Sequence, residues 1–130
     1  MCCKVDKFMA KWIYHNANVD GNRISDCVTR AIKLATGLEY SEVRRKLYHI
    51  SKLFNCTKLC PCCYRHLLEN VFKFKQINCE GYTVGEFADK HPQGTYILRV
   101  PSHLTTIING NLYDTFDCLD DFCDICWKVE

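Results

Sequence analysis

Three side chains of this sequence could combine into a site for nucleophilic chemistry: the thiol of Cys27, the imidazole of His103 and the carboxylate of Asp114. Their types match a nucleophile, a base and a group that orients the base. An ordinary thiol with a pKa of about 8.5 is only a few per cent thiolate at pH 7, so such a site must activate its cysteine. Whether the three groups meet depends on the elements that carry them.

A predicted β-hairpin carries two of these groups. The dipeptide Asn109-Gly110 lies between two β-rich runs, the strongest short-range signal for a two-residue hairpin turn. A turn of that length places Ile108 opposite Asn111 and fixes the register of both strands. The positions facing each other farther along the hairpin can therefore be counted.

Counting outward from the turn places His103 opposite Phe116. Because side chains alternate between faces, Asp114 and Cys118 share the face of His103, whereas Asp117 points away. Diagonal neighbours have Cβ atoms roughly 7 Å apart, so an imidazole and a carboxylate can meet. Asp114 is therefore the better orienting partner for His103.

A predicted helix presents Cys27 in its first turn. Ser25 or Asp26 can cap the helix, and Gly37 is its C-terminal stop. Its apolar positions repeat at helical spacing: Val28, Ala31, Ile32 and Ala35. Unpaired amides and the helix dipole favour a thiolate there, and an adjacent imidazolium favours it further. The charge of Asp26 opposes this unless its side chain turns away to cap.

Further helices are expected in the middle of the chain. Ser41 caps one whose apolar stripe is Val43, Leu47, Ile50 and Phe54. Another covers 62–74, and a capping box of Thr83 and Glu86 opens a short helix that Pro92 ends.

Strands dominate the last part of the sequence. After an early edge strand at 11–18 and a turn at 19–22, strand alternation starts near Gly94, continues at 104–108 and returns at 125–129. We expect one α+β domain over 1–130, with N-terminal helices packed on a small C-terminal antiparallel sheet.

The order of these groups resembles that of papain-like cysteine peptidases. A cysteine opens a helix in the first third, a histidine begins a strand, and a polar residue lies on the following strand. The segments NRISDCVTRAIKLATG and YTVGEFADKHPQGTYILRVPSHLTTIINGNLYDTFD more narrowly resemble small bacteriophage proteins with that fold. The resemblance covers about two thirds of the chain and leaves a cysteine-rich helical insertion at about 55–80 outside it.

The resemblance implies a peptidase or amidase acting on a protein or peptide, with no cofactor needed for catalysis. Cys27 would attack a carbonyl, His103 would take and return the proton, and Asp114 would hold the ring in its useful tautomer. The Cys27 amide would donate to the oxyanion. Where papain has a glutamine before its cysteine, this sequence offers the side-chain amide of Asn22, with Asn18 more distant.

The cysteine-rich segment indicates a second kind of site. Cys60 and Cys63 form one CxxC pair and Cys123 and Cys126 another, and two such pairs are a common tetrahedral zinc set. Separated by fifty-nine residues, the pairs could meet only through tertiary contact. The alternatives are free thiols that pack, or a redox pair at Cys60 and Cys63.

Composition indicates which classes of partner and which compartment to expect. The net charge is +2 and the charges are interleaved, which argues against nucleic acid as a partner. The apolar runs are too short to cross a bilayer, and the N-terminus lacks the apolar core of a secretory signal. The eleven cysteines are an odd number, and without a secretory signal we expect them to remain reduced in the cytoplasm. For a phage protein this is the cytoplasm of the host cell.

A binding module is the alternative to an enzyme. A catalytically silent papain-like domain, held by structural zinc, could recognise a host or phage protein. The two hypotheses differ at Cys27, which reacts fast in an enzyme and like an ordinary thiol in a silent module.

Overall fold

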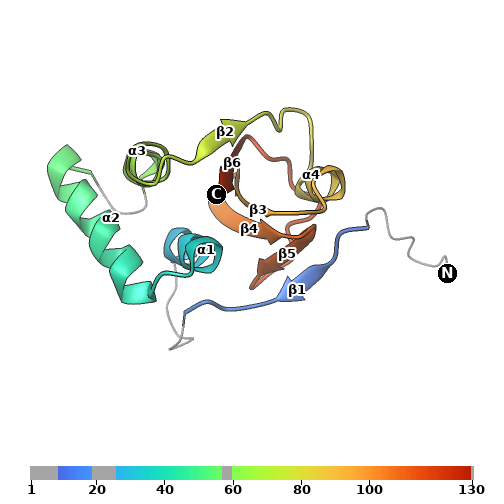
Figure 1. The fold of residues 1–130 in the computed structure, drawn as a ribbon, viewed down its shortest axis with the longest axis horizontal. Helices are drawn as coiled ribbons and strands as arrows, with labels where there is room; N and C mark the ends of the chain where they lie inside the picture. Colours follow the sequence, from blue (N-terminus) through green and yellow to red (C-terminus); the bar gives the residue numbers. More distant parts are fainter. Residues whose placement is uncertain (1–8, 19–25, 57–59, 130) are drawn as a thin grey trace.

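A six-stranded mixed sheet forms the centre of the computed structural model, which describes residues 9–18, 26–56 and 60–129 (Figure 1). The elements in chain order are β1 (Trp12–Tyr14), α1 (Cys27–Thr36), α2 (Tyr40–Phe54), α3 (Pro61–His66), the π-helical turn η1 (Leu67–Val71), β2 (Lys75–Ile77), α4 (Val84–Lys90), β3 (Thr95–Val100), β4 (His103–Ile108), β5 (Asn111–Asp114) and β6 (Ile125–Val129). The fold class is therefore α+β, as predicted.

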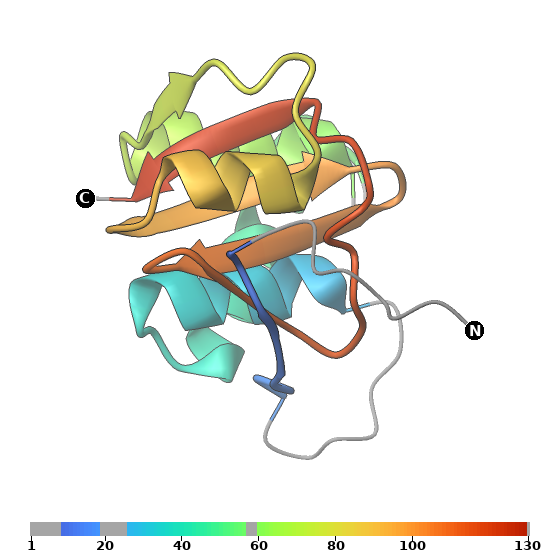
Figure 2. The same cartoon turned by 90° about the vertical axis from the view of Figure 1, so that its right-hand side faces the viewer.

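The strands follow the spatial order β1-β5-β4-β3-β6-β2. All neighbouring pairs are antiparallel except β1 and β5, which run parallel. The prediction of a wholly antiparallel, C-terminal sheet was wrong on this point. The N-terminal segment adds β1 to the far edge of the hairpin, where its backbone pairs with β5 (Figure 2).

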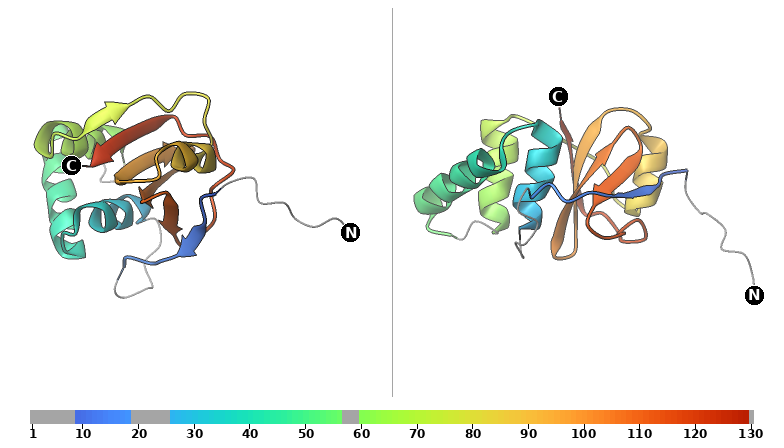
Figure 3. Two further views of the ribbon diagram at one scale, coloured as in Figure 1. Left: turned by 45° about the vertical axis from the view of Figure 1, so that its right-hand side comes forward. Right: turned by 90° about the horizontal axis from the view of Figure 1, so that it is seen from below.

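Helices cover both faces of the sheet. Figure 3 shows α1, α2 and α3 on one side and α4 on the other. Successive side chains of a strand point to opposite faces of the sheet and so contribute to a hydrophobic core on each face. Ile97 and Trp127 pack with the first three helices, whereas Leu98 and Cys126 pack with α4. The prediction placed the helices in one group, but burying both faces of the sheet requires a helix on each.

Local signals placed most of the helix ends. Gly37 ends α1 in the left-handed conformation, and Thr83 and Glu86 form the predicted capping box. The second helix begins at Tyr40, one residue before Ser41, and Glu39 caps it without a side-chain hydrogen bond. Its predicted apolar stripe extends one turn too far, because Phe54 is half exposed. Ser25 and the predicted turn at 19–22 lie outside the described residues.

The segment between α2 and α4 differs most from the prediction. Instead of one helix over 62–74, α3 begins at Pro61 and continues as η1, after which β2 pairs with β6 at the sheet edge. The Glu69 carboxylate accepts a hydrogen bond from Trp127 Nε1 at 2.8 Å. A ring contact between Tyr64 and Trp127 further holds this segment against β6.

Candidate active site

The first residue of helix α1 is Cys27, and Asp26 is its N-cap. Val28, Ala31 and Ile32 are buried on the face of the helix that meets the sheet. The Thr106 hydroxyl of β4 donates to the Ala31 carbonyl at 2.9 Å, which fixes the helix on that strand. The amphipathic pattern of the sequence therefore positions the thiol at the end of the sheet where β4 begins.

The β4–β5 hairpin has the predicted register. Ile108 pairs with Asn111, and both turn residues, Asn109 and Gly110, have positive φ. A Cβ atom at Gly110 would lie 3.2 Å from Pro92 Cα, so glycine also allows a close approach to the segment after α4. The turn chemistry of two residues thus sets the alignment of the strand that begins at His103.

His103 and Asp114 meet across this hairpin as the register predicts. His103 Nε2 lies 2.6 Å from Asp114 Oδ2, and both side chains are largely buried. Asp114 also accepts hydrogen bonds from the Thr105 hydroxyl and the Thr115 amide. The His103 ring contacts Phe116, with centroids 4.5 Å apart. The imidazole is therefore held by a carboxylate on one side and an aromatic ring on another.

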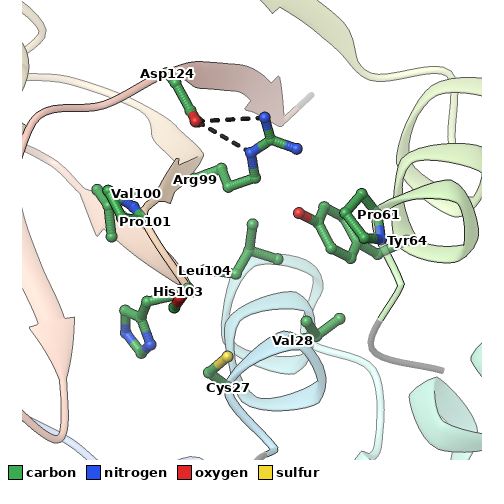
Figure 4. A pocket seen from close by; sticks show the side chains of 11 residues that line it. Cys27, Val28, Pro61, Tyr64, Arg99, Val100, Pro101, His103, Leu104 and Asp124 are labelled. Atoms are coloured by element: carbon green, nitrogen blue, oxygen red, sulfur yellow. Dashed lines mark hydrogen bonds and ion pairs between the residues drawn. The ribbon is translucent and has the colours of Figure 1, made fainter. Parts of the chain in front are cut away.

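The Cys27 thiol lies beside this histidine, and both residues line one pocket (Figure 4). Burial alone would raise the pKa of Cys27, but the hydrogen bond and charge of His103, with the Leu104 amide and Arg30, together lower it. Burial alone would lower the pKa of His103, but Asp114 and Cys27 raise it to about 9. The two shifts share one contribution, because Cys27 and His103 each stabilise the charged form of the other.

The charge of Asp114 is maintained in the same way. Burial would raise its pKa, but the hydrogen bonds from His103, Thr105 and Thr115 and the positive charge of His103 lower it. The rival third residue, Asp117, accepts a hydrogen bond from the Leu119 amide. Asp114 is therefore the carboxylate that contacts His103.

Asp26 turns its carboxylate away from the first helical turn. It makes no side-chain cap hydrogen bond and instead accepts bonds from Asn18 Nδ2, the Tyr40 hydroxyl and Arg30 Nε. Burial would raise the pKa of Asp26, but these bonds and the charge of Arg30 lower it. The negative charge expected to oppose a Cys27 thiolate is paired with a cation.

Arg30 is a part of the site that sequence reasoning missed. Besides Asp26, its guanidinium reaches the Thr115 hydroxyl at 3.1 Å and Asp114 Oδ1 at 3.7 Å. It therefore ties the start of α1 to the end of β5. Its spacing of four residues from Asp26 on a helix was a signal for the first contact, but only the fold brings it to Asp114.

A pocket of about 460 Å³ opens beside Cys27 and His103 (Figure 4). Its walls come from α1, from the β3–β4 connection and from α3, which contributes Pro61 and Tyr64. At the far end Arg99 forms a bidentate pair with Asp124. The volume is in the range of small-ligand sites.

The four cysteines predicted to share zinc are not brought together. Cys60 and Cys63 lie with the first three helices, whereas Cys123 and Cys126 are buried with α4. The two pairs are therefore in the cores on opposite faces of the sheet. Within the described ranges, Cys56, Cys60 and Cys62 do form a group that could hold a metal ion, with ligand atoms within 4.8 Å of one another.

Asn22, the predicted oxyanion donor, lies outside the described residues, and the Asn18 amide is engaged by Asp26. Cys118 lies beside the His103–Asp114 pair, with its sulfur within 4.8 Å of their ligand atoms, although β5 ends at Asp114 and Cys118 follows in the loop beyond it. No helix among the described residues is long and apolar enough to cross a membrane.

Comparison with known proteins gives no relative: no family model, no curated protein and no solved structure matches this chain.

Proposed function

We propose that this protein is a papain-like thiol hydrolase, a peptidase or amidase, that uses Cys27, His103 and Asp114. The observation that carries the proposal is the convergence of the three groups from helix α1 and from both strands of the β4–β5 hairpin. The thiol at the start of α1 interacts with an imidazole whose Nε2 lies 2.6 Å from a buried carboxylate. This is the arrangement of nucleophile, base and orienting group that acyl transfer needs.

In the proposed reaction the Cys27 thiolate attacks the carbonyl carbon of an amide. Because Nε2 of His103 is engaged by Asp114, the proton passes through Nδ1 to the leaving amine. The C–N bond breaks and an acyl-enzyme thioester remains. His103 then takes a proton from water, the hydroxide attacks the thioester, and the thiolate is regenerated with release of the acid.

The helix end supports the negatively charged intermediate. Amides of a first helical turn lack intrahelical partners, and the helix dipole favours negative charge there. Asp26 directs its carboxylate to Asn18, Tyr40 and Arg30 instead of capping that turn. The Cys27 amide is therefore the oxyanion donor that we propose.

The pocket favours a protein or peptide as the substrate. Val28, Pro61, Tyr64 and Leu104 give it apolar walls, while the pair of Arg99 and Asp124 gives one end polar groups. Such a surface suits an apolar side chain with the polar backbone of a peptide beside it. Following the resemblance to phage proteins, we place the activity in the cytoplasm of an infected bacterium.

The test measures hydrolysis of a mixed-sequence library of internally quenched peptides by three proteins. We expect turnover by the unchanged chain and by Cys126→Ala, whose lost thiol lies in the core on the α4 side, and none by Cys27→Ala. Turnover by Cys27→Ala would contradict the proposal. Absence of turnover, together with an ordinary alkylation rate at Cys27, would favour the silent binding module.

A further inference from the structure

Four cysteines gather where α2 ends and α3 begins: Cys56, Cys60, Cys62 and Cys63. The left-handed conformation of Asn55 ends α2, and the Cys56 amide bonds back to the Ser51 carbonyl at 3.0 Å. Cys56 therefore follows directly on the end of α2.

Helix α3 presents its cysteines from one tight first turn. Cys60 is the N-cap, and its carbonyl accepts the amides of Cys63 at 2.9 Å and Tyr64 at 3.3 Å. Pro61 at the first helical position sets the backbone of this turn. One turn of backbone therefore presents Cys60, Cys62 and Cys63 close together.

The sulfur positions suit a tetrahedral metal ion. Those of Cys56, Cys60 and Cys62 lie within 4.8 Å of one another, and the Cys60 and Cys62 sulfurs are 3.0 Å apart. In a tetrahedral site with Zn–S bonds of about 2.3 Å, the sulfurs are roughly 3.8 Å apart, so those of Cys60 and Cys62 must move apart as the ion binds. Cys63 lies outside this group of three, and its buried thiol is 3.1 Å from the Leu47 carbonyl, so it must turn towards the other sulfurs to serve as the fourth ligand.

We propose that Cys56, Cys60, Cys62 and Cys63 bind one structural zinc ion that joins the end of α2 to the start of α3. Four thiolates complete the tetrahedron and leave no open position, as in structural zinc sites. As Zn²⁺ binds, the four S–H groups release four protons to solvent and the Cys63 thiol gives up its bond to Leu47. Cys62 is exposed, which gives the ion a path from solvent.

This site differs from the pairing expected from the CxxC motifs. It keeps Cys60 and Cys63 but replaces Cys123 and Cys126 with two cysteines of the same segment. The spacing of the cysteines did not indicate this site, because Cys62 and Cys63 are adjacent and Cys56 belongs to no CxxC motif.

The metal would also hold one wall of the pocket, a consequence that rests on the proposed function. Pro61 and Tyr64, which line the pocket, are direct sequence neighbours of the proposed cysteine ligands Cys60, Cys62 and Cys63. Loss of zinc would let this wall move while Cys27 and His103 remain in place on α1 and β4. The metal and the thiol chemistry can thus be tested separately.

The decisive experiment measures the metal content of protein purified under reducing conditions with zinc supplied. We expect one zinc ion per chain, measured by inductively coupled plasma mass spectrometry. Replacement by Co²⁺ should give the thiolate charge-transfer and tetrahedral ligand-field bands of a four-sulfur site. Cys56→Ser, Cys60→Ser and Cys62→Ser should each weaken zinc binding at least tenfold, and Cys63→Ser should shift the cobalt spectrum to three sulfurs. The matched variants Cys123→Ala and Cys126→Ala should keep one zinc.

A second measurement uses the unchanged chain and does not depend on how the variants fold. Alkylation mapped before and after chelation should show four thiols, those of the proposed site, becoming reactive together while the alkylation rate of Cys27 stays the same. Substoichiometric zinc, bound iron, a Cys60–Cys62 disulfide that persists in reductant, or loss of zinc on removing Cys123 or Cys126 would each overturn the zinc site. None of these outcomes bears on hydrolysis by Cys27.

Discussion

Cys27 and Cys118 are two thiols beside the same histidine and aspartate, but their surroundings act on them in opposite directions. Cys27 contacts His103, and its pKa is lowered despite burial. Cys118 is also buried near the pair, yet burial and the negative charge of Asp114 raise its pKa to about 12. One ion pair therefore favours the thiolate on its cationic side and suppresses it on its anionic side.

The comparison shows that a cationic partner distinguishes Cys27 from other buried cysteines of this protein. On the α4 side of the sheet, burial is the first cause that raises the pKa of Cys79, Cys123 and Cys126, and no imidazole is among the causes. Cys27 is buried too, but it has a cation to stabilise its thiolate. The number of cysteines in the sequence does not show which of them has a cationic partner.

The largest expected effect is the difference in alkylation between these two thiols in the unchanged chain. With a pKa of about 12, Cys118 is thiolate to only about one part in 10⁵ at pH 7. We expect Cys27 to react with iodoacetamide more than a thousandfold faster, measured as a time course mapped by mass spectrometry. Equal rates in the folded protein would refute the activation of Cys27.

Removing the histidine should abolish much of this difference. Without the imidazolium, Cys27 in His103→Ala should return to an ordinary pKa of about 8.5 or above, which leaves about 1% thiolate near pH 6.5. We expect its alkylation rate at that pH to fall, because the imidazolium that lowers the pKa of Cys27 is gone. His49→Ala, which removes a histidine from α2, is the matched control and should leave the rate unchanged.

Asp114→Asn should shift the pH range of activity. In the unchanged chain, His103 stays protonated up to a pKa of about 9, so it can protonate a leaving amine at lower pH and loses this ability above that value. Hydrolysis should fall above about pH 9, while alkylation of the Cys27 thiolate should not. Both should fall as pH drops below the lowered pKa of Cys27.

Because a neutral amide cannot stabilise the imidazolium, the pKa of His103 should decrease in Asp114→Asn and the upper limb should move to lower pH. About a tenfold loss of hydrolysis is expected near pH 8, with the His103 pKa followed by NMR titration. Asp117→Asn is the matched control, since that carboxylate bonds to the Leu119 amide. A shift of the His103 pKa by both variants would contradict the assignment of Asp114.

The smallest expected effect concerns the support of the carboxylate. Thr105→Val keeps the shape of a buried side chain but removes the hydroxyl that donates to Asp114 Oδ2. We expect a loss of about 1.5 kcal/mol in the free energy of unfolding, since the bond is to a charged group. Hydrolysis should fall only a few-fold because His103 and Thr115 still bond to Asp114. Urea unfolding and peptide turnover check the two effects.

Local chemistry made much of the site predictable. The Asn109-Gly110 turn fixed a hairpin register from which the meeting of His103 and Asp114 could be counted, and Gly37 marked the end of the Cys27 helix. These signals succeed because a two-residue turn and a helix stop act over a few residues, without help from the rest of the chain.

Contacts between distant segments were not predictable in this way. The parallel pairing of β1, the edge strand β2 and the burial of both sheet faces depend on which surfaces remain to be covered after the hairpin forms. The bond from Arg30 to Thr115 joins residues eighty-five positions apart. Nothing in the local pattern of either residue specifies it.

The cysteines show the difference between local sequence signals and contacts between distant segments. The sequence by itself determined that Cys27 opens a helix and that His103 and Asp114 share one face of a hairpin, because both follow from the periods of helix and strand. Contacts between distant segments bring the start of this helix to the hairpin and place Cys60 and Cys63 across the sheet from Cys123 and Cys126. Alternation along β6 turns Cys126 towards α4 and Trp127 towards α3, and the sheet keeps the two sets of thiols apart.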